Sequence, residues 1–392
     1  MTDERSESPA GQERHAPQEA LAGIKVIDLS AGVAGQFAGR VLGEHGADVV
    51  LVEPPEGCAL RRPRRTEDRH LFRHLNTGKR AVALDRATPT GRAALAALVA
   101  GADVVIVDDG TDPAPWLVGD PRVVGCAIRD FAPHGPYAEW QGSEMIHQAL
   151  SGLMYTTGRA EAEPLYGFGY RAYYSAGAAA VAAIVGALIV RRRTGRGQWL
   201  DIRVHETAVA MSQNLVAQYS YNGSWPARGP YPGACDLLQC RDGWASFYCR
   251  GDRWRAFCAE LGVPDLPGDA RFAAIDVLLR NWQAAYEVLA PVVRVMTVDD
   301  FVGRVIRARG LASRVNTMAD ALACPHLGAR EFWERTPGLT DDTLPSDDSA
   351  AQGARVDRPL MLGPLFRMSA TPRRVRGPSP PPGARLRGGE GA

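Results

Sequence analysis

The residues with the clearest capacity for chemistry lie at positions 142–152, which read GSEMIHQALSG. Glu144 is a carboxylate at the start of a stretch with helical character, and the histidines His134 and His147 lie close to it in the sequence. A carboxylate can act as a nucleophile, and a histidine can orient a substrate. A purely structural interpretation stays open, because an acid is favoured in the first turn of a helix, Ser143 is a natural N-cap, and an isolated histidine is more often a packed or surface residue.

An acidic residue after a glycine turn gives a second candidate site. Glu53 follows such a turn by about twenty residues, the spacing at which dinucleotide-binding proteins place the acid that holds a ribose. The glycines of this turn do not follow the G-x-G-x-x-G spacing, and the looser match at residues 167–172 has Arg192 where an acid is expected. The sequence therefore disfavours NAD as a ligand.

Other catalytic and metal-binding motifs are absent from the sequence. It contains no Walker A segment, no G-x-S-x-G elbow and no H-E-x-x-H pair, which leaves P-loop, hydrolase and zinc-protease interpretations without support. The cysteines form no C-x-x-C pair and no metal-ligand spacing, so disulfide and zinc frameworks are disfavoured, and we expect no metal site. These cysteines are Cys58, Cys126, Cys235, Cys240, Cys249, Cys258 and Cys324.

The first hundred residues alternate between short apolar runs and helical stretches. This alternation is typical of βαβ units, whose right-handed crossovers produce a parallel sheet. We expect a Rossmann-like open sheet, in which ligands bind at the carboxyl ends of the strands. The expected strands cover residues 23–29, 47–52, 81–84 and 102–107, and the expected helices cover a stretch ending near 46 and residues 90–100.

Beyond residue 137 the pattern changes to longer helices. The run 172–190 contains no charged residue and is about long enough to span a bilayer. Its many alanines and glycines instead favour a helix packed inside the protein. The expected elements are helices over 144–154, 173–190 and 206–219 with a strand over 199–204, followed by α/β elements at 244–249, 253–261, 282–295 and 298–308.

These patterns divide the chain into a large and a small domain. The class is α/β: a large domain with a Rossmann-like open parallel sheet and a smaller α/β domain. Termini poor in large apolar residues are expected to be disordered. The boundaries are a disordered terminus over 1–20, the large domain over 21–221, a Pro/Gly-rich linker over 222–233, the small domain over 234–325, a return to the large domain over 326–371, and a disordered tail over 372–392.

The charge balance limits the partners of the protein. Lys and Arg number 45 and Asp and Glu 44, a formal net charge of +1, so no overall field attracts nucleic acid or an acidic membrane. We interpret the arginine clusters as solvated faces, although the cluster at 61–65 could hold a phosphate-bearing ligand. The polar N-terminal segment has no secretory pattern. We expect a cytoplasmic protein that acts on a small molecule.

Several segments together resemble one enzyme family, the class III coenzyme A transferases (CaiB/BaiF, formyl-CoA transferase type). LNTGKRAVALD at 75–85 is similar to the family's Leu-Asn-x-x-Lys-Arg-Ser-Val-x-Leu-Asp segment. The order and spacing of these segments make the resemblance specific, and it extends from about residue 21 to 372. The other segments are LAGIKVIDLS at 21–30, GADVVLVEPP at 46–55, ADVVIV at 102–107 and TGRGQ at 194–198.

The resemblance implies an interlocked homodimer that holds coenzyme A on the Rossmann-like domain as an acyl-CoA substrate, with no tightly bound cofactor. Backbone N–H groups at a helix start and a lysine can both bind phosphate. A solvated strand entrance is the alternative interpretation for Lys79. By position, the implied contacts are Gly32, Val33, Leu75, Asn76, Gly78, Lys79, Asp108, Asp109, Arg129, Phe131 and Ala132.

The resemblance also places Glu144 where the family's Gly-Tyr-Asp segment has its nucleophilic aspartate. A carboxylate there attacks a thioester to give a mixed anhydride, the thiolate returns to form an enzyme-bound thioester, and an acceptor acid reverses the cycle. Glutamate is one methylene longer, and a displacement of about 1 Å can cost on the order of a hundredfold in rate unless the pocket adjusts.

Departures from the family pattern leave an alternative function open. An Arg-Pro-Gly stretch after Asp109 is missing, and Asp130-Phe-Ala132 replaces Gly-Phe-Gly. Lost glycines restrict how closely a backbone approaches a ligand. The chain could therefore be an inactive member that serves as partner subunit of an active paralogue. Acyl-CoA racemisation is disfavoured, because Ser143 and Tyr173 stand where the racemases have a histidine and a second acid.

Overall fold

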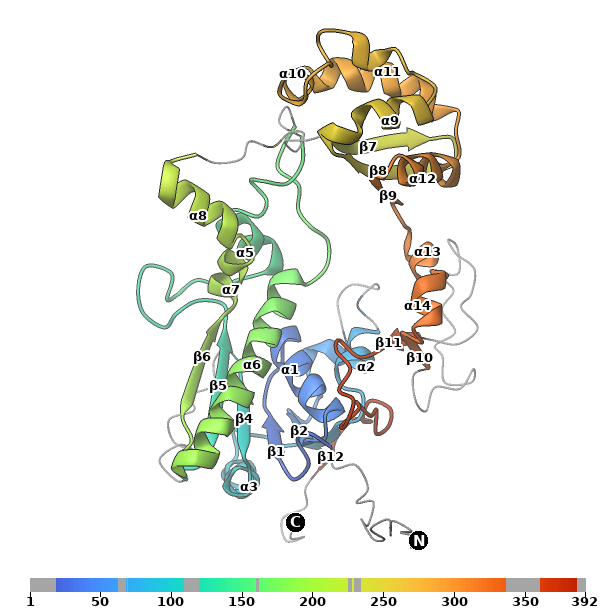
Figure 1. The fold of residues 1–392 in the computed structure, drawn as a ribbon. Coiled ribbons are helices and arrows are strands. Elements are labelled where there is room, and N and C mark those ends of the chain that lie inside the picture. Colours follow the sequence, from blue (N-terminus) through green and yellow to red (C-terminus); the bar gives the residue numbers. More distant parts are fainter. Residues whose placement is uncertain are drawn as a thin grey trace, which may run out of the picture. The chain divides into compact units, whose positions relative to one another are not determined.

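The computed structural model divides the chain into two compact units, which are described separately (Figure 1). Unit 1 comprises residues 1–154, 166–224 and 331–392, and unit 2 comprises 155–165 and 225–330. The structure describes residues 19–62, 68, 70–108, 120–159, 162–224, 228, 234–335 and 360–385. Asp109, residues 63–67 of the arginine cluster, most of the 222–233 linker, residues 1–18 and residues 386–392 lie outside this description.

Unit 1 is built on a parallel sheet in the order β12-β3-β2-β1-β4-β5-β6. The chain order reverses between β1 and β4, which is the point where doubly wound sheets bind ligands. The predicted Rossmann-like sheet is confirmed. Its strands are β1 (Lys25–Asp28), β2 (Asp48–Glu53), β3 (Arg80–Ala83), β4 (Val104–Val107), β5 (Val124–Arg129), β6 (Trp199–Arg203) and β12 (Ala384–Arg385).

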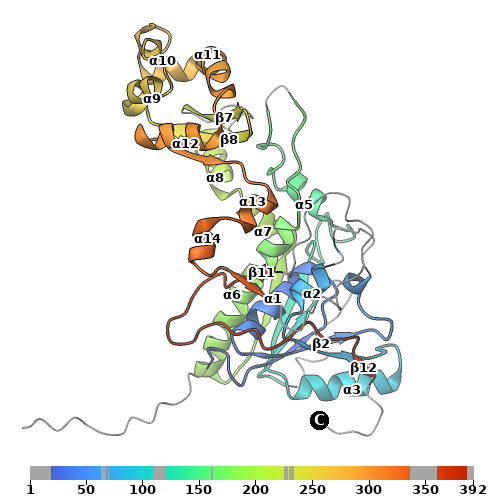
Figure 2. The same ribbon diagram turned by 90° about the vertical axis from the view of Figure 1, so that its right-hand side faces the viewer.

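Apolar residues alternate between the two faces of this sheet. Val26 packs beneath α1 (Val33–Glu44) and α6 (Arg171–Thr194), whereas its neighbour Ile27 packs with α3 (Pro89–Ala100) on the opposite face. Figure 2 shows α3 separated from α1 and α6 by the strands. Because helices cover both faces, the strands have near-continuous apolar sequences such as VVIV in β4.

Helix α6 is long and apolar enough to cross a membrane by length and composition. Its residues Ala172, Ala176, Ala180 and Ile184 recur every four positions and are fully buried in the core that α6 shares with α1 and the sheet. Small residues on this stripe allow the two helices to approach closely. The sequence-based interpretation of a packed helix is therefore the one that the structure supports.

Other helices differ in extent from the sequence-based expectations. Helix α5 ends four residues early (Glu144–Leu150), and the expected helix over 206–219 is two helices, α7 (Val204–Ala210) and α8 (Gln213–Asn222). Ser212 lies at this break as the N-cap position of α8. Short elements complete unit 1: η1 (Ala59–Arg61), α2 (Leu71–Leu75), and the antiparallel pair β10 (Trp333–Arg335) and β11 (Leu360–Leu362).

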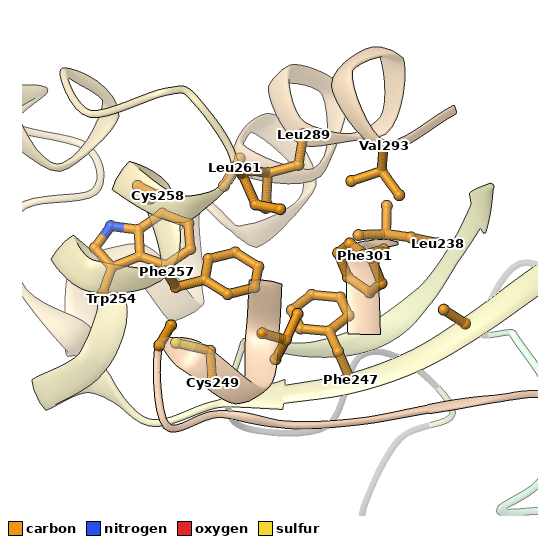
Figure 3. Close-up of a cluster of buried hydrophobic side chains, with 14 of the residues drawn as sticks. Leu238, Phe247, Cys249, Trp254, Phe257, Cys258, Leu261, Leu289, Val293 and Phe301 are labelled. Carbon is orange, nitrogen blue, oxygen red and sulfur yellow. The ribbon is translucent and has the colours of Figure 1, made fainter. Parts of the chain in front are cut away.

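Unit 2 packs helices against an antiparallel sheet in the order β7-β8-β9. Figure 3 shows its apolar core, in which Phe247 of the sheet stacks on Phe257 of α9 at 5.3 Å between ring centroids. The indole of Trp282 donates to Asp236 at 2.9 Å, which satisfies its buried polar group. The elements are β7 (Ala234–Cys240), β8 (Gly243–Cys249), η3 (Gly251–Arg253), α9 (Trp254–Glu260), η4 (Leu266–Gly268), α10 (Ile275–Arg280), α11 (Trp282–Arg294), α12 (Val298–Arg307), β9 (Leu311–Arg314), α13 (Met318–Leu322) and α14 (Pro325–Ala329).

The segment 372–385, which was expected to belong to a disordered tail, packs within unit 1 in the structure. Figure 2 shows the segment beside β2 and α3, and strand β12 pairs with β3. The Arg373 guanidinium binds the Glu44 carboxylate through two nitrogens at 2.8 Å each. Ion pairs and backbone hydrogen bonds hold this segment, and neither requires large apolar residues in the sequence. Its composition therefore predicted disorder.

Candidate active site

The reversal point of the sheet places Gly32 and Asp108, two of the expected coenzyme A contacts, beside each other. Gly32 is the N-cap of α1, and the Asp108 carboxylate follows β4 and accepts hydrogen bonds from the backbone N–H groups of Ala31 and Gly32, the latter at 2.9 Å. Val33 begins α1 and is buried. The N–H groups that were expected to meet a phosphate are thus bonded to a carboxylate of the chain.

The segment 75–79 turns its polar side chains inward. The Lys79 ammonium donates to the Asp28 carboxylate at 2.8 Å, to the Gln36 carbonyl at 2.7 Å and to the Asn76 side chain at 2.9 Å. These three bonds use all its protons. Burial lowers the pKa of Lys79, and the Asp28 carboxylate opposes this effect. Lys79 and Asn76 therefore form an internal network, and this arrangement does not fit the expected contact of Lys79 with phosphate.

The two remaining predicted residues of this segment are also enclosed. Leu75 is fully buried. Gly78 adopts a left-handed conformation with φ of +75°, which strains any residue with a Cβ, and its N–H donates to the Pro378 carbonyl at 3.1 Å. The C-terminal segment thus occupies the backbone group that sequence reasoning assigned to coenzyme A.

The predicted residues Arg129, Phe131 and Ala132 lie at the carboxyl end of β5. Phe131 is buried in a cluster of rings, with His147 at 5.4 Å and His205 at 5.7 Å between centroids. Tyr137 and Trp140 complete this cluster. The ring of Phe131 therefore forms an apolar wall of the site. The polar groups of the site come from neighbouring residues.

Glu144 lies at the start of α5 and reaches the N-terminus of α6. Its Oε1 accepts from the Ala172 N–H at 2.8 Å, and its Oε2 accepts from the same group at 3.1 Å and from the Tyr173 N–H at 3.4 Å. The N-cap residue of α6, Tyr170, supplies no side-chain acceptor. Glu144 fills that role from another helix, and its charge complements the positive end of the α6 dipole.

Gln148 holds the same carboxylate from one helical turn further along α5. Its Nε2 donates to Glu144 Oε1 at 2.7 Å and to the Gly167 carbonyl at 2.8 Å, while its Oε1 accepts from the Gly167 N–H at 3.0 Å. Both Glu144 and Gln148 are buried, at 6% and 3% exposed. The Glu144 carboxylate therefore has three donors, because the Ala172 N–H lies within hydrogen-bonding distance of both its oxygens.

A second carboxylate, which sequence reasoning did not single out as a site residue, lies beside this cluster. Asp130 follows β5, and its Oδ1 accepts from the Tyr173 hydroxyl at 3.1 Å and lies 2.9 Å from His147 Nε2. Its Oδ2 accepts from the Gly142 N–H at 2.9 Å. A Cβ on Gly142 would lie 2.4 Å from His147 Nε2, so only glycine permits this arrangement. The available signal was an acid directly after an apolar strand, but its contact with His147 depends on tertiary structure.

These contacts keep Asp130 charged. Burial alone would raise the pKa of the Asp130 carboxyl, but hydrogen bonds from His147, Gly142 and Tyr173 and the charge of His147 lower it overall. His147 Nε2 lies 2.9 Å from Asp130 Oδ1, while Nδ1 of the fully buried ring has no hydrogen-bond partner among the described residues. Burial and proximity to His147 lower the pKa of His205.

The two carboxylates are joined through one residue. Tyr173 gives its backbone N–H to Glu144 and its hydroxyl to Asp130. The described residues contain no group of three or more His, Cys, Asp or Glu side chains that could hold a metal ion. The arrangement can carry an acyl group on a carboxylate, with backbone amides and a hydroxyl nearby to stabilise negative charge.

The fold is a Rossmann-type sheet with a second unit inserted in the chain, and the site contains two carboxylates fixed by hydrogen bonds. Together these features define an α/β protein suited to group transfer. The chain belongs to CoA-transferase family III, whose family model matches residues 21–385. It is 29% identical to succinate–glutarate CoA-transferase of Agrobacterium fabrum over 92% of each chain. It is 30% identical to succinyl-CoA:mesaconate CoA-transferase of Haloarcula hispanica over 84% of this chain and 87% of that one.

The fold also matches a solved structure. A CaiB/BaiF family protein from Brucella suis superposes with a TM-score of 0.83 at 28% identity, covering 93% of this chain and 96% of that chain. The resemblance inferred from the sequence is confirmed, both for the family and for the fold.

Proposed function

We propose that this CoA transferase moves coenzyme A from an acyl-CoA donor to a carboxylic acid. The observation that carries the proposal is a carboxylate at the N-terminus of α6, Glu144, in a chain whose relatives bear the names of CoA transferases. Fixed amides beside a carboxylate can stabilise the negative charge that develops as it attacks a thioester, because they need no reorganisation.

The proposed reaction proceeds by exchange on the enzyme. A carboxylate of the chain, Glu144 in the sequence-based assignment, attacks the acyl carbon and releases coenzyme A as its thiolate. The thiolate then attacks the carboxylate carbon of the mixed anhydride, which releases the donor acid and leaves an enzyme thioester. An acceptor acid reverses these two steps. Glu144 must first exchange its present hydrogen bonds for the substrate, because both its oxygens are occupied.

The proposed coenzyme A contacts remain at the carboxyl ends of β1 and β4. A phosphate at the start of α1 would replace the Asp108 carboxylate on the N–H groups of Ala31 and Gly32. Two negative groups cannot share these donors without repulsion. Lys79 and Asn76 contribute by fixing α1 and the 75–79 segment through their shared network.

Calorimetry with coenzyme A tests the proposal directly. We expect binding at millimolar ligand or below, followed by transfer of coenzyme A between an acyl-CoA and a carboxylic acid in a coupled assay. If circular dichroism shows that the protein is folded but it binds no coenzyme A at millimolar concentration, the proposal is refuted.

A second candidate function is a non-catalytic subunit that partners an active paralogue. Three features favour it. Both oxygens of Glu144 already accept hydrogen bonds, the Lys79 ammonium is paired with Asp28, and the Asp108 carboxylate accepts from the backbone N–H at the start of α1. Absence of coenzyme A binding together with co-purification of a paralogue would select this alternative. Racemisation gains less support, because the site has one histidine–aspartate pair and Tyr173 where a second base would stand.

We also propose that the protein works in the cytoplasm as an interlocked homodimer. Exposed apolar side chains on α5 and α8 support a partner surface, since a lone monomer rarely exposes so many large residues. Light scattering after size exclusion should give twice the chain mass, and a monomer at micromolar concentration would contradict this proposal. These side chains are Met145, Ile146, Leu150, Val216, Tyr219 and Tyr221.

A further inference from the structure

Arg171 is a cation beside the Glu144 carboxylate that the proposed reaction does not use. It is the first residue of α6 and directly precedes Ala172, whose N–H donates to Glu144 Oε1 at 2.8 Å. Arg171 is exposed, and its guanidinium makes no hydrogen bond or ion pair with another residue that the structure describes. An arginine stays protonated at any ordinary pH, so a positive charge is always present at this place.

The guanidinium of Arg171 lies against the turn that Gln148 fastens. A Cβ on Gly167 would lie 2.7 Å from Arg171 Nη1 and 3.1 Å from Gln148 Oε1, so both side chains lie against the same glycine. Gln148 in turn donates to Glu144 Oε1 at 2.7 Å. The cation is therefore separated from the Glu144 carboxylate by one amide side chain.

The stability of α6 does not explain an arginine at this position. The N-terminus of a helix is the positive end of its dipole, so a cation in the first turn is the disfavoured charge there. The basic residues that complement the dipole are at the other end of α6, where Arg191, Arg192 and Arg193 form its last turn. A ligand that is negatively charged gives Arg171 a role that the helix itself does not.

The acids beside Arg171 do not neutralise its charge. Glu144 accepts from backbone amides and from Gln148, and Asp68 accepts from the Tyr170 hydroxyl at 2.8 Å. These donors are neutral, and in the described part of the chain no ion pair joins either carboxylate to Arg171. The guanidinium therefore keeps its parallel N–H groups for a carboxylate that arrives with a substrate.

We propose that Arg171 is a specificity-determining residue that binds the second carboxylate of a dicarboxylic acyl group. This inference rests on the proposed CoA-transfer function and names its substrate class. Glu144 meets the thioester carbonyl, while the guanidinium binds the far end of a short acyl chain through two parallel N–H···O bonds. A monocarboxylic acyl group has no charge at that end and leaves the guanidinium with water alone.

The place of Arg171 favours a carboxylate of the acyl group over a phosphate of coenzyme A. The phosphates of coenzyme A are separated from its sulfur by the whole pantetheine arm. Arg171, in contrast, is the chain neighbour of the residue whose N–H binds the proposed nucleophile. An anion that reaches both Glu144 and Arg171 must therefore belong to the group that is attached to the sulfur.

Calorimetry with two acyl-CoAs of equal chain length tests the role of Arg171. The full-length protein is titrated with coenzyme A, with glutaryl-CoA and with pentanoyl-CoA, which has a methyl group where glutaryl-CoA has its carboxylate. We expect glutaryl-CoA to bind about tenfold to a hundredfold more tightly than pentanoyl-CoA, as expected for hydrogen bonds between charged groups. Arg171→Met should remove this preference and leave the affinity for coenzyme A and pentanoyl-CoA unchanged. With free acids as acceptors, it should raise KM for glutarate and leave kcat unchanged, because the contact is the same in the ground and transition states.

Two further variants make the test specific. Arg192→Met removes an exposed arginine at the other end of α6 and should keep the preference of the wild type. Arg171→Lys retains the charge but not the planar fork, so it should keep only part of the preference. This variant also tests the inference if Arg171→Met does not fold.

The outcomes separate the inference from the proposed function. Equal affinity of the wild type for the two acyl-CoAs, or a preference that persists in folded Arg171→Met, overturns the inference and leaves the proposed function standing. Equal weakening of coenzyme A and both acyl-CoAs in Arg171→Met assigns the arginine to coenzyme A and also overturns the inference. If the folded wild type binds none of the three ligands, the proposed function is refuted as well.

Discussion

At the scale of single residues, the buried charge of Lys79 is the clearest case of a side chain whose environment decides its role. Its ammonium is 1% exposed and faces an Asp28 carboxylate that is fully buried. A pair of this kind contributes little net stability compared with apolar packing, but the loss of one partner leaves the other charged and unpaired.

We therefore expect Lys79→Met to lower the free energy of unfolding by on the order of 3–5 kcal/mol. The double variant Asp28→Asn/Lys79→Met should recover part of this loss, because it removes both charges. Urea unfolding measures both values, and Lys25→Met on the exposed face of β1 is the matched control. Equal stability of Lys79→Met and wild type would show that the ammonium is not held as described.

Glu144 allows a prediction that does not depend on catalysis. Glu144→Ala leaves the N–H groups of Ala172 and Tyr173 without acceptors, and a lost cap of this kind costs about 1–3 kcal/mol. Hydrogen exchange of the first turn of α6 should accelerate, while the exposed Glu56→Ala control should match wild type. Unchanged exchange in that turn would contradict the capping role.

At the scale of elements, a network of buried ions fastens the C-terminal segment to α1. Arg373 binds both oxygens of Glu44 and, at 2.6 Å, Glu334, while Arg40 Nε donates to Glu44 Oε1 at 2.7 Å. The Arg40 guanidinium also contacts the imidazole of His74 in α2. The Glu44 carboxylate thus binds two guanidinium groups, and these link α1 to α2 through His74 and to β10 through Glu334.

Arg373→Ala should release the 360–385 segment. The loss of one partner of a buried ion pair costs on the order of 3 kcal/mol, because Glu44 then retains fewer donors. Limited proteolysis should cleave near residue 373 sooner than in wild type. Arg374→Ala, one residue away and exposed, should show the wild-type pattern, and identical cleavage of all three proteins would refute the fastening role.

His74 predicts how this region responds to acid. Burial, and secondarily the Arg40 charge, lower the pKa of His74 from 6.5 to about 4. Because the folded pKa lies below the unfolded one, the folded state disfavours the proton, and stability falls as the pH drops from about 6.5 to about 4. The loss reaches roughly 3 kcal/mol by linkage. His74→Asn should flatten this part of the stability profile in urea unfolding at several pH values, and parallel profiles would contradict the assignment.

The elements that sequence could predict are those with a repeating apolar pattern. β1, α1, β2, α3, β4 and α6 have such patterns, and all form near the expected positions. β12 has two residues and no pattern, so it could not be predicted. The same limit applies to the site: Asp130 and His147 were visible as residue types, but they lie 17 positions apart and only the fold brings them within 2.9 Å.

At the scale of the whole molecule, the two units have separate cores and should respond separately to mutation. Phe257→Ala removes a fully buried ring from unit 2 and should cost about 3–5 kcal/mol there. Hydrogen exchange should accelerate in α9 and β8 and remain unchanged in β1 and β4. Val288→Ala, on the exposed side of α11, is the control, and equal acceleration in both units would show that they unfold as one.

Strand β12 has a consequence for how the protein is made. It covers the outer edge of β3, although β3 leaves the ribosome long before residues 384–385 are translated. Until then β3 exposes unpaired backbone groups, and an open strand edge is a template for pairing with another chain. Slow translation should therefore raise aggregation of the nascent chain, and a chaperone that shields β3 should relieve it.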